Sequence, residues 1–193
     1  MANGARTTRK KTSSTTYKWL DELDRHLYYY DEKRANRIIN FMERFCRNPK
    51  SGKLFKLLEW QKDPLREFYG VLKKGTPHRK AQTLYLEVPK KNGKTGLLQG
   101  LNLYHTGADG ERAAECYCCG GSKTQARILH RGAKAMIEIE PWLNKRFSIY
   151  TDQINHPKSG SIFTVLPANA KLQHGYDVSA ITVDELHVQP NSE

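Results

Sequence analysis

The 193-residue sequence predicts an α/β fold in which a mainly parallel sheet is flanked by helices. The first observation behind this prediction is the alternation of strand-like and helix-like segments between residues 84 and 185, which is typical of parallel sheets with helical crossovers. The second is a pair of β-prone runs, Leu84–Val88 and Ala180–Val183, each followed by residues suited to phosphate or metal chemistry. We expect helices on both faces of the sheet.

The first fifty residues precede this alternation. Residues 1–16 form a basic, polar tail rich in Thr and Ser, a composition that predicts disorder. Helical periodicity begins at Tyr17, where three leucines share one face, and repeats more clearly through Ile38–Cys46. Asn, Pro, Ser and Gly then break the chain between residues 48 and 52. We therefore expect a disordered tail (1–16), an N-terminal helical segment that packs beside the sheet (17–50) and the main domain (51–193).

The main domain opens on Leu54–Gln61, followed by an amphipathic helix. A glutamine can both donate to and accept from the adenine edge, and a neighbouring aromatic ring can cover the base. By itself Trp60-Gln61 is an ordinary helix start. Ahead of a phosphate-binding motif, Gln61 becomes a candidate for base recognition.

That motif lies in Leu84–Thr95, a β-prone run that turns into a helix-compatible segment. A Gly-Lys-Thr between strand and helix builds a triphosphate cradle from backbone N–H groups, a phosphate-bridging lysine and a threonine hydroxyl that reaches Mg²⁺. We interpret Lys94 as the phosphate lysine and Thr95 as a magnesium ligand. Because Val88 stands where the standard motif has glycine, Gly-Lys-Thr alone is also compatible with a solvated turn. The rest of the cradle comprises Pro89, Lys90, Lys91, Asn92 and Gly93.

The second half of a nucleotide site appears in Ala180–Glu185. Mostly apolar residues followed by two acids describe a buried strand whose carboxyl end delivers carboxylates to the crevice where open α/β sheets bind ligands. Asp184 would hold Mg²⁺, directly or through water, and Glu185 would act as the general base that polarises the attacking water. An Asp-Glu pair that simply begins a helix is the alternative. The two motifs together favour a site for ATP and Mg²⁺.

Helix and strand signals alternate between the two motifs. We expect the last two strands before the acidic strand to form a hairpin or to be neighbours. The expected elements are a helix from Thr95 to Gly107, a strand over Ala113–Cys119, a helix capped at Gly120–Ser122 whose apolar face runs to Ile137, and strands over Arg146–Thr151 and Ser161–Leu166 around a turn at His156–Gly160.

The chain carries 32 Lys and Arg against 20 Asp and Glu, a net charge of +12. This excess favours a polyanionic partner, of which nucleic acid is the commonest, and a solvated basic surface is the weaker alternative. No apolar run reaches the length of about eighteen residues that a membrane span requires, and the N-terminus lacks the apolar core of a signal peptide. We therefore expect an intracellular protein.

Four cysteines fit that compartment. Cys116, Cys118 and Cys119 lie in one predicted strand, and Cys46 lies far away in a helix. A zinc site needs ligands paired at turn spacing, whereas neighbouring residues of a strand point to opposite faces. We expect buried free thiols.

These motifs together resemble a known family, the large subunit of tailed-phage terminases. The resemblance runs from Leu54 to His187 and rests on Leu-Leu-Glu-Trp-Gln, Pro-Lys-Lys-Asn-Gly-Lys-Thr, Ser-Lys-Thr-Gln-Ala, and His-Gly-Tyr-Asp followed by Ile-Thr-Val-Asp-Glu-Leu-His. It implies a RecA-like P-loop ATPase that, as a homo-oligomeric ring on the portal, pumps double-stranded DNA into a procapsid. It also implies the portal protein and the small terminase subunit as partners, in the cytoplasm of the bacterial host.

The resemblance also assigns roles to single residues. Gln61 matches the adenine-binding glutamine, Lys94 and Thr95 the phosphate loop, Asp184 the metal-binding acid and Glu185 the catalytic base.

Three further positions are less sharply assigned by the resemblance. Lys90 and Lys91 stand where the family often has an arginine that serves as a finger. Lysine lacks the planar fork of arginine, so the identity of the finger stays open. Gln125 and His174 match motif positions, and Gln125 is equally compatible with a helix surface.

The last residue, Glu193, follows the acidic strand closely. The coupling motif and the nuclease acids that the family implies do not occur before it. We interpret the chain as the front part of a longer protein, a truncated gene product or a split subunit, with an incomplete ATPase domain and an open sheet edge. Two other function classes stay open: another nucleic-acid-dependent P-loop ATPase such as a helicase, and a non-catalytic basic module that binds DNA.

Overall fold

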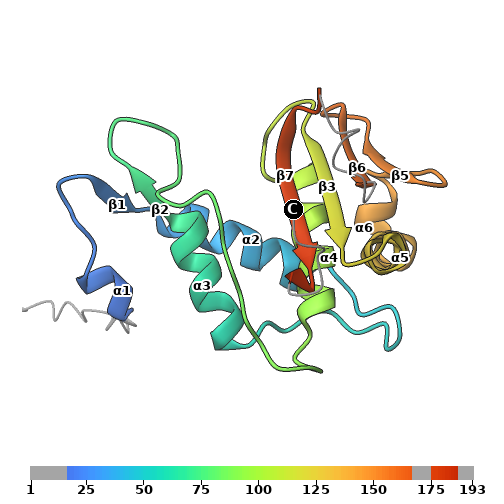
Figure 1. Cartoon of the computed structure of the whole chain (residues 1–193), viewed down its shortest axis with the longest axis horizontal. Coiled ribbons are helices and arrows are strands. Elements are labelled where there is room, and N and C mark those ends of the chain that lie inside the picture. Colours follow the sequence, from blue (N-terminus) through green and yellow to red (C-terminus); the bar gives the residue numbers. More distant parts are fainter. Residues whose placement is uncertain (1–16, 167–174, 187–193) are drawn as a thin grey trace, which may run out of the picture.

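The computed structural model describes residues 17–166 and 175–186 (Figure 1). The disorder expected for residues 1–16 lies outside this part, and so does His174. Among the described residues, no helix combines the length and the apolar character needed to cross a bilayer. The helices are α1 (Lys18–Asp21), α2 (Glu32–Phe45), α3 (Glu59–Gly70), α4 (Lys94–Gly107), α5 (Lys123–Ile139) and α6 (Pro141–Asn144). The strands are β1 (Tyr28–Tyr30), β2 (Val71–Lys73), β3 (Glu115–Gly120), β4 (Ser148–Ile149), β5 (Gln153–His156), β6 (Ser161–Val165) and β7 (Val178–Asp184).

The N-terminal part contains less helix than its leucine spacing predicts. α1 is a single turn, and Tyr28–Tyr30 forms β1, which pairs antiparallel with β2. The predicted helix is wrong at Leu27, whose exposed fraction is 58%. Consecutive tyrosines favour a strand, and their partner strand lies far along the chain, where local periodicity cannot detect it. The domain boundary at residue 50 stays a prediction.

α2 confirms the second helical prediction. The Asp31 side chain accepts a hydrogen bond of 3.0 Å from the backbone N–H of Arg34, which satisfies one of the free donors at the helix start. Ile38, Ile39 and Met42 are buried on one face of the helix. This face joins the central core, to which α3 and α4 also contribute.

The main sheet has the strand order β4-β5-β6-β3-β7. β3 pairs parallel with β6 and β7, whereas β4 and β5 are antiparallel to their neighbours. The predicted hairpin around residues 156–160 is confirmed, but its first strand is β5, and only two residues of the expected strand Arg146–Thr151 pair in the sheet as β4. The sheet is therefore mixed, with the acidic strand β7 in its parallel part.

The β-prone run before the phosphate loop is not a strand of this sheet. Leu84–Val88 has no ladder partner among the described strands, although its side chains alternate between half-buried and exposed. In Figure 1 it belongs to the long connection that leads from β2 to α4. A β-prone run becomes a strand only where a neighbouring backbone pairs with it. The expected strand is therefore wrong within the described residues.

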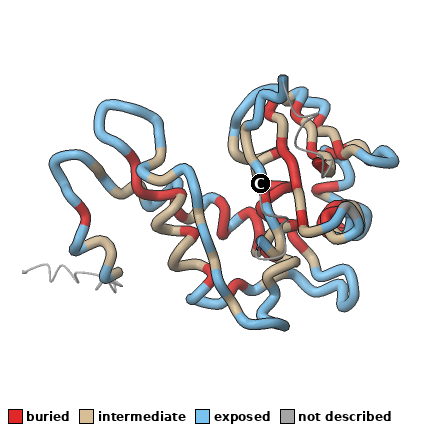
Figure 2. Tube along the Cα trace, in the orientation of Figure 1, coloured by how far each residue is buried: buried red, intermediate tan, exposed pale blue. Residues whose placement is uncertain are grey.

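The described helices cover one face of the main sheet. Cys116 and Cys118 of β3 and Phe163 of β6 point into the core, where α4 and α5 pack. Ile181 and Val183 of β7 point to the opposite face and are 48% and 36% exposed. Figure 2 shows the buried β3 beside the more exposed β7. The helices expected on that second face are not found in the part of the chain described.

α4 is held by contacts to both α5 and β7. A Cβ at Gly132 of α5 would lie 1.9 Å from Nε2 of Gln99, so the glycine permits the close approach of the two helices. On the sheet side, Nδ2 of Asn102 donates to Oγ1 of Thr182 at 2.8 Å, and this bond is buried. The helix that follows the phosphate loop is thereby tied directly to the acidic strand.

The cysteine prediction holds for three of the four thiols. Cys46, Cys116 and Cys118 are buried and free, whereas Cys119 is half-buried. Burial raises the pKa of the Cys116 thiol to about 11 and the pKa values of Cys46 and Cys118 to about 12. These thiols therefore stay protonated and unreactive at neutral pH. The described residues contain no group of three or more His, Cys, Asp or Glu that could hold a metal ion.

His130 of α5 makes the stability of the fold depend on pH. Its side chain is buried beside Phe163, and its Nε2 has no hydrogen-bond partner in the described part of the chain. Burial first, and then the charge of Lys134, lower its pKa from 6.5 to about 4. The folded state therefore binds fewer protons than the unfolded state between these two pH values, and stability falls as the pH drops through this window.

We expect this histidine to remove about 2 kcal/mol from the free energy of unfolding between pH 7 and pH 5. Urea unfolding at both pH values should show a smaller pH dependence for His130→Gln than for the wild type, by about that amount. His26→Gln makes the same chemical change at an exposed position and is the matched control. Parallel pH profiles for wild type and His130→Gln would contradict the assignment.

Candidate nucleotide site

The phosphate loop forms a tight turn at the start of α4. Gly93 is the N-cap residue with φ of 76°, and Lys91 has φ of 68°. Both values lie in the left-handed region, which glycine occupies freely and lysine only at a cost. Nδ2 of Asn92 donates to the carbonyl oxygen of Pro89 at 3.1 Å and holds the turn. Because the first N–H groups of a helix lack intrahelical partners, this turn fits an anionic group such as a phosphate.

Lys94 and Asp184, far apart in the sequence, meet at this turn. Nζ of Lys94 lies 3.0 Å from Oδ1 of Asp184, and the two side chains are 33% and 14% exposed. Lys94 is the first residue of α4, and Asp184 is the last residue of β7. The two motifs that the sequence separates therefore form one site at the carboxyl end of the acidic strand.

Asp184 fits a divalent cation. Its Oδ1 is buried and accepts no hydrogen bond of acceptable geometry within the described residues, although the ammonium of Lys94 is close. A buried carboxylate oxygen is costly unless it is paired, hydrogen-bonded or bound to a metal. Mg²⁺ prefers oxygen ligands, takes one or two carboxylates and keeps several waters. The carboxylate of Asp184 and the hydroxyl of Thr95, the residue after Lys94, are donors of that kind.

Glu185 is turned away from the strand direction and is held by α5. Its φ of 53° is left-handed, a conformation that costs a non-glycine residue on the order of 1 kcal/mol. Nε2 of Gln125 donates to Oε2 of Glu185 at 2.8 Å. Gln125 is itself placed by the helix cap, since its backbone N–H donates to Oγ of Ser122 at 3.2 Å. The carboxylate next to Asp184 therefore has one defined orientation.

Gln61 lies against the phosphate loop. Its Nε2 donates to the carbonyl oxygen of Asn92 at 3.5 Å, and its Oε1 accepts from the backbone N–H of Leu58 at 2.9 Å. The side chain is buried and both of its polar ends are engaged. Adenine recognition by Gln61 would require it to exchange these bonds for bonds to the base. That role stays a prediction, whereas its position beside the loop is observed.

The remaining predicted residues are placed less tightly. Lys90 and Lys91 are exposed in the turn, and neither forms an ion pair in the described parts of the chain. Which of them acts as the finger stays open.

Gln125 is the residue whose importance the sequence analysis underestimated. The available signal was its position three residues after Ser122, at the start of a helix that follows a strand.

Residues 59–193 match the family described as terminase large subunit, ATPase domain. The chain belongs to this family. The terminase large subunit of Enterobacteria phage HK97 is 30% identical over 159 residues, which cover 79% of this chain and 30% of that protein. The crystal structure of the HK97 bacteriophage large terminase has a TM-score of 0.69 and 28% identity, and the match covers 79% of this chain and 31% of that chain.

Membership in the terminase family confirms the expected fold class, an α/β ATPase domain of the RecA-like P-loop type with helices packed on its sheet. The terminase chain spans less than a third of the length of both relatives. Its nucleotide-site residues Lys94 and Asp184 come from the start of α4 and the end of β7.

Proposed function

We propose that this terminase chain hydrolyses ATP and that hydrolysis drives the packaging of double-stranded DNA into a phage procapsid. The observation that carries the proposal is the meeting of Lys94 and Asp184 at the phosphate turn, with Glu185 oriented next to them. A lysine at a helix start, a buried acid and a second, positioned acid are the parts that phosphoryl transfer from ATP requires. The family supports ATP as the substrate.

Different residues of the site perform the different steps of ATP hydrolysis. The free N–H groups of α4 and the ammonium of Lys94 bind the β- and γ-phosphates. Glu185 accepts a proton from a water aligned with the γ-phosphorus. The bond from that phosphorus to the bridging oxygen of ADP breaks as the bond to water forms, which yields ADP and phosphate. Lys94, with Lys90 or Lys91, stabilises the charge on the transferred group.

Asp184 and Thr95 would hold Mg²⁺, which neutralises phosphate charge when it is bound. In the structure, the ammonium of Lys94 offsets the charge of Asp184 instead. Nucleotide binding would therefore move Lys94 from the carboxylate to the phosphates. The ion pair compensates both charges.

The proposed motor requires partners beyond ATP. They are double-stranded DNA, the portal protein, the small terminase subunit and further copies of the chain in a ring, all in the cytoplasm of the bacterial host. The net charge of +12 supports the first of these, because a basic protein attracts polyanions.

ATP hydrolysis by the purified chain, measured with and without duplex DNA, tests the proposal. Turnover that DNA stimulates would support it. Mg²⁺-dependent nucleotide binding without turnover would show that the pocket forms but that the reaction needs a group from outside the chain. Salt-sensitive DNA binding with no effect of ATP would favour a non-catalytic module, and strand separation would favour a helicase.

Gln125 should act as a positioning residue for Glu185. We expect Gln125→Ala to lower kcat by roughly tenfold without changing the affinity for ATP, because misplaced catalytic groups lose rate rather than binding. Steady-state kinetics and nucleotide titration would separate the two effects. Thr124→Ala, at an exposed neighbouring position, is the matched control. A rise in KM with unchanged kcat would show that Gln125 serves binding or structure instead.

A further inference from the structure

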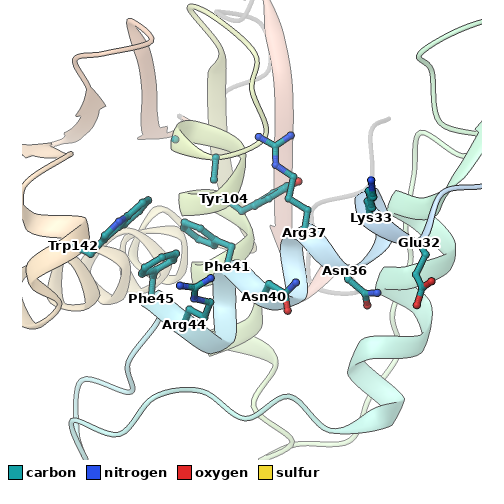
Figure 3. A pocket seen from close by; sticks show the side chains of 12 residues that line it. Glu32, Lys33, Asn36, Arg37, Asn40, Phe41, Arg44, Phe45, Tyr104 and Trp142 are labelled. Atoms are coloured by element: carbon teal, nitrogen blue, oxygen red, sulfur yellow. The ribbon is translucent and has the colours of Figure 1, made fainter. Parts of the chain in front are cut away.

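A groove of about 720 Å³ runs along one side of α2, between this helix, the end of α4 and Trp142 of α6. It is open to solvent. Figure 3 shows the side chains that project from α2 into it and the aromatic rings beside them. None of the nucleotide-site residues lines this groove. We call it the α2 groove.

Cations without acidic partners give the α2 groove its charge. Lys33, Arg37 and Arg44 are exposed, and none of them forms a salt bridge within residues 17–166 and 175–186. The nearby Arg47, by contrast, is bound to Glu140 at 2.7 Å. Arg47 is thus paired with an acid, whereas the groove cations remain available to an external anion.

Side-chain amides accompany these cations. Asn36 and Asn40 line the groove from the same face of α2, one helical turn apart. Residues 33 to 44 extend about 16 Å along the helix axis. The α2 groove therefore presents a row of hydrogen-bond donors and positive charges, which matches a linear polyanion better than a compact ligand.

An aromatic pair closes one end of the row. The rings of Phe45 and Trp142 are stacked with their centroids 3.9 Å apart. The guanidinium of Arg44 lies over the Phe45 ring at 5.5 Å, and that of Arg146 lies over the Trp142 ring at 3.8 Å. The contact with Phe45 holds the guanidinium of Arg44 at the groove before any ligand arrives, which lowers the entropy cost of binding.

We propose that the α2 groove binds the phosphate backbone of double-stranded DNA. Exposed Lys and Arg side chains with interleaved amides are the groups that contact DNA phosphates. The rings of Phe45 and Trp142 are stacked on each other and carry guanidinium groups, so they are not free to stack on the bases of a single strand. Among the described residues, Glu32 is the one acid that lines the groove, and its place in the first turn of α2 suits the helix N-terminus. The identity of the polyanion rests on the proposed function.

The test is binding of a short fluorescein-labelled duplex to the full chain, followed by anisotropy over a range of salt concentrations. In Arg37→Gln/Arg44→Gln we expect at least about tenfold weaker binding near physiological salt, and a slope of log K against log salt that is shallower by about 2. Arg112→Gln/Arg131→Gln removes the same charge from exposed positions that do not line the groove. This control should keep the wild-type slope.

The alternative outcomes each overturn the proposal. Equal losses in the groove variant and the control would mean that only net charge matters. DNA binding that survives in the groove variant but disappears when the four basic residues of the 1–16 tail are changed to Gln would assign the contact to the tail. Displacement of the duplex by poly-glutamate at equal charge concentration would indicate an acidic protein partner.

The two proposals fail separately. Binding of a Mg²⁺-bound ATP analogue should be unchanged in the groove variant, since the α2 groove contains no nucleotide-site residue. The chain could bind DNA through the groove and yet show no response to ATP. That result would contradict the proposed motor and would support the α2 groove as a DNA-binding site. ATP turnover combined with DNA binding that is unchanged in Arg37→Gln/Arg44→Gln would support the motor and contradict the role of the α2 groove.

Discussion

Glu185→Gln should lower ATP turnover by at least about 100-fold while the affinity for nucleotide stays within about twofold of the wild type. The amide keeps the size of the side chain and an acceptor oxygen for Gln125, so the 2.8 Å contact can persist. It has no basicity with which to take a proton from water. Single-turnover hydrolysis and titration of a fluorescent ATP analogue would measure the two quantities independently.

Glu138→Gln is the matched control for this substitution. It makes the same chemical change at an exposed position of α5 and should alter neither quantity. If Glu185→Gln loses binding and turnover to the same degree, Glu185 is a binding or folding residue and not the base. Unchanged turnover would move the base role to another group.

Lys94→Ala should weaken nucleotide binding by at least about tenfold, because a hydrogen bond to a charged phosphate contributes roughly 1.5–3 kcal/mol. The same substitution leaves Asp184 without its ion partner. We expect a loss of about 1–2 kcal/mol in the free energy of unfolding, less than for a fully buried pair because Lys94 is 33% exposed. Isothermal titration with a nonhydrolysable analogue and urea unfolding would give both values.

The double variant Lys94→Ala/Asp184→Asn tests whether the loss of stability in Lys94→Ala comes from the uncompensated charge of Asp184. Without the uncompensated charge of Asp184 the stability should recover, whereas nucleotide binding should stay weak. Lys50→Ala, in an exposed turn, is the control for loss of a lysine. Recovery of nucleotide affinity along with stability would mean that Lys94 acts through the fold and not through the phosphates.

Much of the candidate site was predictable because its signals are local. The turn at Gly93 and the helix that begins at Lys94 follow from a left-handed glycine and a helix start within a few residues. The strand that ends at Asp184 follows from a short apolar run. For Gln125 the sequence offered only a match to a family motif. Its contact with Glu185 could not be predicted, because that residue belongs to a different element. The roles of these residues remain proposals.

The errors in the fold have a shared physical origin. Leu84–Val88 has the composition of a strand but lacks a partner among the described strands. Tyr28–Tyr30 lies in an apparently helical pattern but pairs with β2. In both cases strand formation depends on a backbone that is distant in sequence. Side-chain periodicity contains no information about whether that backbone is present.

The sequence by itself determined the helical periodicity of α2, the phosphate turn before α4, the acidic end of β7 and the positive charge of the chain. These properties depend on neighbouring residues or on composition alone. Only the tertiary structure decided that Lys94 meets Asp184 at 3.0 Å, that Gln125 orients Glu185, and that the helices described cover one face of the main sheet. Such contacts depend on how distant segments pack, because burial and strand pairing are properties of the folded chain as a whole.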